Sequence, residues 1–360
     1  MFRILIALLR STLWGIGLRG RRLTPEEFGK LMRKAEKQCL TGHVAQALMD
    51  NGIALEKHDA VECLATQHEV AEQNKKVNEA LRALCQLLDE AQLRYVVVKG
   101  QTLLPLYRHG ENRVSGDVDF YCPPDTFAQA KTLIDKAWHV EWEIDADEGF
   151  QHYAFEHEGI SFEMHFCLKK FYSRRSQRYF DRLIADADYI RRRVGEMSVP
   201  VLPPHLEIAY TFLHLYHHLA NKGVALRQFC DVAMLLHHRH YDAEKLKEVL
   251  RSVDHEKAFK AVGAVLVDVL GLPEEEVPYT LTEKDRRHLK AILQVVVRHG
   301  NFGFYGNKHR SRSGWKYYRE SLVHKMQLLQ HFYTLAPREM RNTLIKAIPQ
   351  KIMLALKREK

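Results

Sequence analysis

The chain has 360 residues, of which 46% are hydrophobic and 28% charged. This composition excludes a disordered or low-complexity protein, and the length suits two domains. Lys and Arg number 54 against 45 Asp and Glu, a net charge of +9. Anionic partners such as nucleotides, nucleic acids or anionic lipids are therefore expected, without a choice among them.

The N-terminus and the cysteines bear on the compartment in which the protein works. Apolar residues recur at helical spacing over 2–16, but Arg3 and Arg10 interrupt the run, so neither a signal peptide nor a spanning helix is predicted. We expect an amphipathic helix docked on the rest of the protein; the alternative is weak contact of residues 2–22 with a membrane surface. The six cysteines include no Cys-x-x-Cys pair, which excludes a zinc knuckle and indicates reduced thiols in the cytoplasm.

Helical sequence precedes a segment of mixed elements. Residues 1–74 form a predicted N-terminal helical region, in which Thr24 caps a helix that begins at Pro25, and a long helix follows over 70–91. From Tyr95 onward strands and helices alternate, as expected of an α/β core over residues 75–170. Its predicted strands are 95–98, 117–121, 139–144, 152–156 and 160–166, with helical segments at 102–107 and 126–137. The last two strands form a hairpin that turns at Glu158-Gly159.

Only helices are predicted after residue 172, which makes 171–360 a C-terminal helical region. These helices cover 205–219, 227–237, 243–252, 258–270, 283–298 and 315–333. The expected fold class is therefore α+β, a small mixed sheet with flanking helices that is preceded and followed by helical regions.

Three acidic residues of the core carry the strongest chemical signal. Asp117 and Asp119 are separated by one residue on a predicted strand, so their side chains lie on one face, about 7 Å apart at the backbone. Like charges held together are costly unless a cation lies between them, and carboxylate oxygens suit Mg²⁺. Glu163 adds a third carboxylate from a strand that we expect beside the first. The pattern is typical of a two-metal phosphoryl or nucleotidyl transfer site, and a solvated strand end is the alternative.

Three segments together resemble the polymerase-beta-type nucleotidyltransferase superfamily: Val97–Gly100, Arg113–Phe120 and Phe162–Phe166. They are most similar to a bacterial branch of uncharacterised nucleotidyltransferases. That branch has Lys-Gly where better-known relatives have Gly-Gly or Gly-Ser, an Arg shortly before the Asp-x-Asp, and an acidic-x-His on the third strand. The resemblance covers residues 75–170 and extends weakly to about 240.

The resemblance implies a nucleotidyltransferase-type sheet and a metal-dependent transfer of a nucleoside monophosphate from NTP to a hydroxyl or phosphate acceptor, with release of pyrophosphate. It implies that Asp117, Asp119 and Glu163 are catalytic and bind two Mg²⁺ ions, and that Glu163 also helps to deprotonate the acceptor. It implies that Lys99 and Gly100 contact the triphosphate, a role that also suits a strand-to-helix turn. Two departures are the Glu in place of an expected third Asp and the missing hydroxyl of a Gly-Ser loop.

Several further residues have two interpretations each. Arg113 either steadies phosphate or pairs with an acidic neighbour, and His165 is a candidate for supporting the metal ligands. Arg227 and Asp231 are spaced as a helix ion pair. Because their helix and the one before it follow the core directly, we also expect them to line the cleft with His218, and Arg227 to bind nucleotide.

The remaining signals leave partners open. His214 and His218 have the spacing of a zinc pair on a helix, but the Glu of a metalloprotease motif is absent, so a dedicated zinc site is not favoured. The basic stretch 169–193 is a nucleic-acid candidate, and a basic loop at 303–314 is interpreted as a surface loop. The acceptor could be a small molecule, a polysaccharide precursor, a protein or RNA. Alternatives to the enzyme are a non-catalytic nucleotide-binding protein with a degenerate fold and an RNA-directed transferase.

Overall fold

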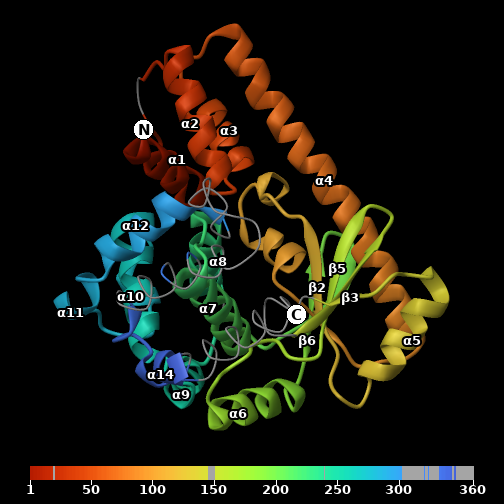
Figure 1. The fold of residues 1–360 in the computed structure, drawn as a ribbon. Helices are drawn as coiled ribbons and strands as arrows, with labels where there is room; N and C mark the ends of the chain where they lie inside the picture. The colour runs from red at the N-terminus through yellow and green to blue at the C-terminus, as the bar shows by residue number, and fades with distance from the viewer. Residues whose placement is uncertain are drawn as a thin grey trace. The chain divides into compact units, whose positions relative to one another are not determined.

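The computed structural model describes residues 1–18, 21–144, 151–238, 240–301 and 332–342, together with positions 320, 323, 344 and 345 (Figure 1). The predicted loop at 303–314 and most of the predicted helix over 315–333 lie outside the described residues. The chain divides into two compact units. The first comprises Met1–Lys170, Asp181–Glu207 and His238–His240, and the second comprises Phe171–Phe180, Ile208–His237 and Tyr241–Lys360.

The first unit begins with four helices. They are α1 (Phe2–Trp14), α2 (Pro25–Lys37), α3 (Thr41–Asp50) and α4 (Lys57–Glu90). The backbone N–H of Glu27 donates to Thr24 Oγ1 at 3.3 Å, and the Glu27 carboxylate accepts from the N–H of Thr24 at 3.1 Å. This reciprocal cap confirms the predicted start of α2. The predicted long helix is also found, although α4 begins well before residue 70.

The apolar face of α1 is covered within the first unit. Leu5, Leu8 and Leu9 are each at most 1% exposed, and α1 contacts α2 and α3. This is the docked arrangement expected of the N-terminal helix, whereas contact of residues 2–22 with a membrane surface stays a prediction. Among the described helices, none combines the length and hydrophobicity needed to cross a membrane.

A five-stranded sheet follows the helices. Its strands are β1 (Val96–Val98), β2 (Asp117–Tyr121), β3 (Glu143–Ile144), β4 (His152–His157) and β5 (Ile160–His165), in the order β1-β2-β5-β4-β3. The β2–β5 pair is parallel and the other pairs are antiparallel. The mixed sheet between helical regions confirms the α+β fold class. Between the strands lie α5 (Phe127–Trp138) and two 3₁₀ segments, η1 (Gly100–Leu106) and η2 (Gly110–Asn112).

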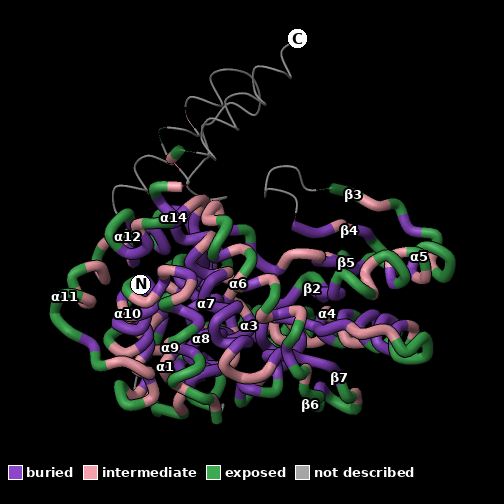
Figure 2. Tube along the Cα trace, turned by 90° about the horizontal axis from the view of Figure 1, so that it is seen from below, coloured by how far each residue is buried: buried purple, intermediate pink, exposed green. Residues whose placement is uncertain are grey.

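Strand alternation gives the sheet one apolar and one polar face. The apolar face packs against α4 and α5 in a single core, and Figure 2 shows α4 running along one side of β2 and β5. The strands contribute Val97, Val118, Phe120, Phe162 and Met164, and the helices contribute Leu81, Leu84, Ala130 and Ile134. Because neighbouring side chains on a strand point in opposite directions, the residues between these apolar positions face away from α4.

The structure corrects the expectation that only helices follow residue 172. After α6 (Arg174–Ala185) comes an antiparallel hairpin of β6 (Ile190–Val194) and β7 (Met197–Val201), whose valines join the core of the first unit. The alternation of β6 is hidden in the sequence because one of its inward positions is an arginine. Arg192 is 7% exposed and makes two hydrogen bonds of 2.6 Å to the Glu207 carboxylate.

The remaining described elements are helical. They are α7 (Pro204–Asn221), α8 (Leu226–His238), α9 (Ala243–Ser252), α10 (Glu256–Val265), a π-helical turn (Leu266–Leu270), η4 (Glu274–Glu276), α11 (Glu283–Arg286), α12 (Leu289–His299) and α14 (Pro337–Asn342). The single helix predicted over 283–298 is instead two helices, α11 and α12, separated by Arg287 and His288.

Candidate active site

The three acidic residues predicted to bind metal lie on the polar face of the sheet. Asp117 and Asp119 are two positions apart on β2, and the parallel register pairs Asp119 with Glu163 on β5. One carboxylate oxygen from each of the three lies within 4.8 Å of the others. Asp119 is 3% exposed, Glu163 is partly buried and Asp117 is exposed, so the group opens toward solvent at Asp117. Three carboxylates at this spacing offer only oxygen ligands and a combined charge of −3, which fits Mg²⁺ ions.

The turn after β1 brings Lys99 against this group. Lys99 has φ +57° and ψ −153°, a conformation that side-chain-bearing residues rarely adopt, and its Nζ lies 2.9 Å from Asp119 Oδ1. Gly100 has φ +46°, and a Cβ there would lie 3.4 Å from the carbonyl oxygen of Asp117. The tight turn therefore holds one cationic side chain, and a residue without a side chain, close to β2.

His165 links the carboxylates of Asp119 and Glu163. Its Nε2 lies 3.0 Å from Asp119 Oδ1 and 3.3 Å from Glu163 Oε2. Burial alone would lower the pKa of His165, but the hydrogen bonds and charges of these two carboxylates outweigh it and raise the pKa. Burial likewise acts to raise the pKa of Glu163, but His165, Lys99 and His152 lower it to about 2. Glu163 is therefore ionised at neutral pH, the state required of a metal ligand.

His152, on β4, is a member of this surface that no sequence motif singled out. Its side chain is 6% exposed, and its Nε2 lies 3.7 Å from Glu163 Oε1. The predicted hairpin already contained the signal. A two-residue turn at Glu158-Gly159 pairs His157 with Ile160, and counting back along both strands pairs His152 with His165.

Arg113 is held inside the protein. Its side chain is 1% exposed and its Nη1 donates to Ser115 Oγ at 2.7 Å, while its carbonyl oxygen accepts from Asn74 Nδ2 on α4 at 2.9 Å. Asn74 also donates to the carbonyl oxygen of Glu111. The long helix thus fixes the loop that leads into Asp117, and nucleotide binding by Arg113 stays a prediction.

The predicted residues of the C-terminal helices belong to the second unit. Arg227 is half-buried at the start of α8, whereas Asp231 and His218 are 4% and 2% exposed. The rings of His214 and His218 are 4.5 Å apart between centroids, and among the described residues no candidate metal group includes either of them. Nucleotide binding by Arg227 stays a prediction.

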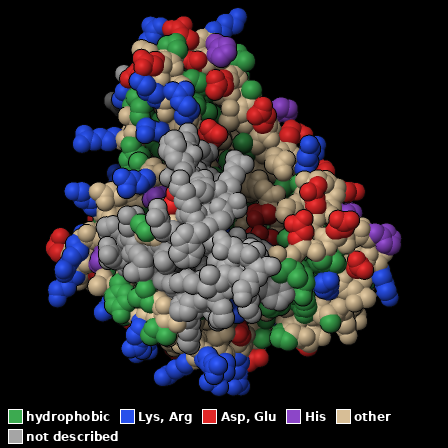
Figure 3. Space-filling view, viewed as in Figure 1, with side chains coloured by type: hydrophobic (Ala, Val, Ile, Leu, Met, Phe, Trp, Pro, Cys, Tyr) green, Lys and Arg blue, Asp and Glu red, His purple; other side chains and the backbone are tan. Residues whose placement is uncertain are grey.

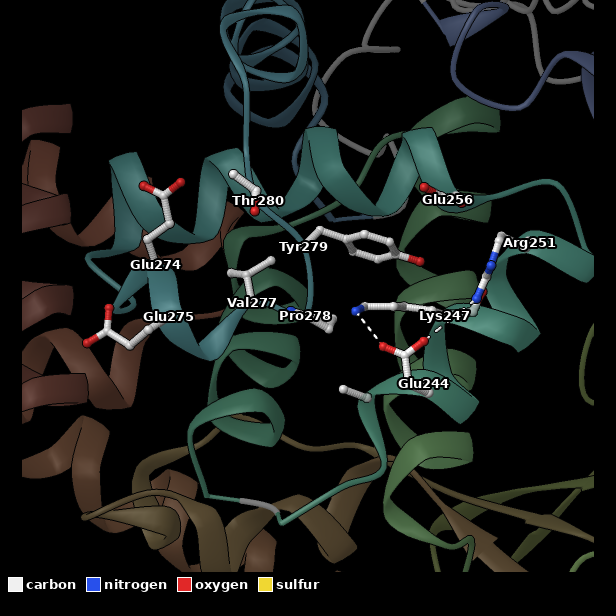
Figure 4. Close-up of a pocket in the computed structure, with 11 residues that line it drawn as sticks. Glu244, Lys247, Arg251, Glu256, Glu274, Glu275, Val277, Pro278, Tyr279 and Thr280 are labelled. Atoms are coloured by element: carbon white, nitrogen blue, oxygen red, sulfur yellow. Dashed lines mark hydrogen bonds and ion pairs between the residues drawn. The ribbon is translucent and has the colours of Figure 1, made fainter.

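A cavity of about 680 Å³ in the second unit contains none of the predicted site residues. Figure 4 shows Tyr279, Lys247 and Glu244 along its wall, with Lys247 Nζ 2.8 Å from Glu244 Oε1. The lining has four glutamates against two cations, Lys247 and Arg251, so the net charge of the cavity is negative and disfavours an anionic substrate. We therefore place the candidate active site on the sheet.

The mixed sheet and its three carboxylates are the features expected of a nucleotidyltransferase, and the family comparison agrees. A model of a family described as "Uncharacterised nucleotidyltransferase" matches residues 24–271, and the chain belongs to that family. The match confirms the resemblance inferred from the sequence, including its weak extension to about residue 240, and extends it further to residue 24 on one side and residue 271 on the other. No curated protein matches the chain. One similar solved structure is an antigenic nucleotidyltransferase-like protein from Paracoccidioides brasiliensis, with 15% identity, a TM-score of 0.37, and coverage of 62% of this chain and 93% of the other.

Proposed function

We propose that this protein is a metal-dependent enzyme that transfers a nucleoside monophosphate from NTP to a hydroxyl or phosphate acceptor and releases pyrophosphate. The observation that supports the proposal most directly is the approach of Asp117, Asp119 and Glu163 to within 4.8 Å on one sheet face. Membership in a nucleotidyltransferase family gives independent support and implies an NTP substrate.

Each residue of the site has a distinct role in this proposal. Asp117, Asp119 and Glu163 would hold two Mg²⁺ ions, which when bound neutralise the triphosphate and stabilise the charge that develops during transfer. Lys99 Nζ lies 2.9 Å from Asp119 Oδ1, beside the position proposed for the metal ions. When the nucleotide binds, Lys99 would exchange this carboxylate contact for a phosphate oxygen. Gly100 would let the triphosphate approach the backbone of the turn.

The acceptor is proposed only as a chemical class, a hydroxyl or a phosphate. Four arginines of α6 are exposed and would suit an RNA acceptor: Arg174, Arg175, Arg178 and Arg182. Figure 3 shows basic side chains gathered over this helix. The aromatic Phe180 on the same helix is 1% exposed, which favours an ordinary amphipathic helix over a base-stacking surface. The other proposed acceptor classes are a small molecule, a polysaccharide precursor and a protein.

The proposal is tested by Mg²⁺-dependent release of pyrophosphate from NTP across a panel of acceptors. Asp117→Asn is the sharpest variant because Asp117 is exposed, so the substitution removes a ligand without emptying the core. We expect a loss of at least a hundredfold in turnover with an unchanged melting temperature. Asp135→Asn is the matched control, since Asp135 is an exposed residue of α5 and the charge change is identical. Equal turnover in Asp117→Asn and wild type would refute the site.

A nucleotide-binding protein without turnover is the second candidate. It is favoured by one observation: Lys99 Nζ and His165 Nε2 both lie within 3.0 Å of the same oxygen of Asp119, so that carboxylate already has two partners within the protein. Calorimetric binding of Mg²⁺-NTP, with no product across the acceptor panel, would select this candidate over the enzyme. Absence of nucleotide binding would contradict both.

A further inference from the structure

Two histidines and one glutamate form a second group of converging donors beside the three carboxylates. The register of the sheet pairs His165 on β5 with His152 on β4, and Glu163 with Ala154. The three side chains therefore lie on the same polar face, and one donor atom from each of His152, Glu163 and His165 lies within 4.8 Å of the others. The three carboxylates of Asp117, Asp119 and Glu163, here called the oxygen-only group, share Glu163 with this second group but include neither histidine.

The distances suit direct coordination. Nε2 of His165 lies 3.3 Å from one Glu163 oxygen, and Nε2 of His152 lies 3.7 Å from the other. With metal–ligand bonds of about 2.1 Å, neighbouring ligands at tetrahedral angles lie roughly 3.4 Å apart. A cation therefore fits among these donors after only small side-chain movements.

The chemistry of the donors selects the kind of ion. Two imidazoles and one carboxylate are the ligands of catalytic zinc sites that keep an open position, whereas Mg²⁺ prefers oxygen alone. Both histidines are 5% exposed, so their rings are held by the surrounding protein rather than mobile in solvent. We propose that His152, Glu163 and His165 bind a divalent transition ion of the Zn²⁺ class, at a position that shares Glu163 with the oxygen-only group.

This inference requires no transferase activity, because it rests on the three ligands alone. Asp117 contributes to the oxygen-only group and His152 to the nitrogen-containing group. The two assignments can therefore fail separately. Loss of turnover in Asp117→Asn tests the first, and loss of Zn²⁺ in His152→Gln tests the second.

The experiment is a Zn²⁺ titration of chelator-treated protein without a histidine tag, in a large excess of Mg²⁺, with a chromophoric chelator as competitor. We expect one tightly bound Zn²⁺ per chain in wild type and in Asp117→Asn, and at least a tenfold weaker Kd in His152→Gln. His157→Gln is the matched control, because His157 lies on the same strand but stacks on Trp138 at a ring-centroid distance of 4.2 Å.

X-ray absorption at the zinc edge provides a reading that does not depend on any variant. Two imidazole ligands in the wild-type spectrum would support the site. Absence of imidazole ligands, displacement of Zn²⁺ by Mg²⁺, or equal Zn²⁺ affinity in wild type and His152→Gln would overturn it. In those cases His165 serves only as an ionic partner of Asp119 and Glu163.

Discussion

Lys99 combines an unusual backbone conformation with a contact to a metal-binding candidate. Its φ of +57° costs roughly 1–3 kcal/mol in a residue with a side chain. The same turn directs its ammonium group to within 2.9 Å of Asp119 Oδ1. Glycine would remove the strain but also the charge, so the lysine indicates a function for the ammonium group.

Replacing Lys99 with Met keeps the aliphatic stem and removes the charge. We expect the Kd of Mg²⁺-NTP to rise about tenfold, equivalent to about 1.4 kcal/mol, because a phosphate partner is lost. We expect Mg²⁺ alone to bind at least as tightly as before, since a cation that competes for Asp119 is gone. Calorimetry with and without nucleotide measures both values.

The control for this substitution is Lys76→Met, at an exposed position of α4. This substitution changes the net charge by the same amount, but Lys76 does not belong to the Lys99-Gly100 turn. If Lys99→Met and Lys76→Met bind nucleotide with equal affinity, Lys99 does not contact the triphosphate.

Sequence reasoning identified the acidic group because each of its members is fixed by local pattern. The spacing of Asp117 and Asp119 on a strand places them on one face, and alternation over β5 gives Glu163 its orientation. The strand of Glu163 was expected beside that of Asp119, but the ionic contacts of Lys99 and His165 with Asp119 could not be predicted, because they depend on strand direction, register and side-chain conformation. No local pattern states that β5 pairs in parallel with β2.

At the scale of elements, the helices were predicted better than the second hairpin. The start of α2 followed from its capping residues, and β2 and α9 from periodicity. The β6–β7 hairpin was missed because Arg192 occupies an inward position, paired with Glu207, and an arginine there breaks the apolar alternation. A buried ion pair is a tertiary feature that sequence periodicity does not record.

The helices before the sheet position the loop that precedes Asp117. Gly42, on α3, lies so close to η2 that an added Cβ would be 2.3 Å from the carbonyl oxygen of Asn112. The Asn112 side chain also donates to Gln46 Oε1 on α3 at 2.9 Å. Because the obstructing atom belongs to the backbone, it cannot be moved by a simple side-chain rotation.

Gly42→Ala should therefore lower the free energy of unfolding by about 1–3 kcal/mol, measured by urea denaturation. In an uncrowded helix the same change stabilises by up to about 1 kcal/mol. Gly29→Ala on α2 is the control, because an added Cβ there meets only the flexible end of Arg33 at 3.3 Å. Equal stability of Gly42→Ala and wild type would show that α3 does not constrain the loop.

For the molecule as a whole, the family match spans more than the five-stranded sheet. It begins at residue 24, just before α2, and ends at residue 271, after the π-helical turn. The region that matches this family thus includes helices that precede β1 and helices that follow the β6–β7 hairpin. The sequence resemblance covered residues 75–170 and was weak from there to about 240, because the helical parts contain no distinctive motif.

In the proposed reaction, the carboxylates of Asp117, Asp119 and Glu163 form the metal site for nucleotidyl transfer. The most direct test is a crystal structure of the full chain with Mg²⁺ and a non-hydrolysable NTP analogue. We predict metal bonds to all three carboxylates, with the triphosphate against the Lys99-Gly100 turn and Lys99 Nζ moved from Asp119 to a phosphate oxygen. A nucleotide bound elsewhere, with Lys99 and His165 still paired to Asp119 and no metal among the carboxylates, would show that these residues are not the active site.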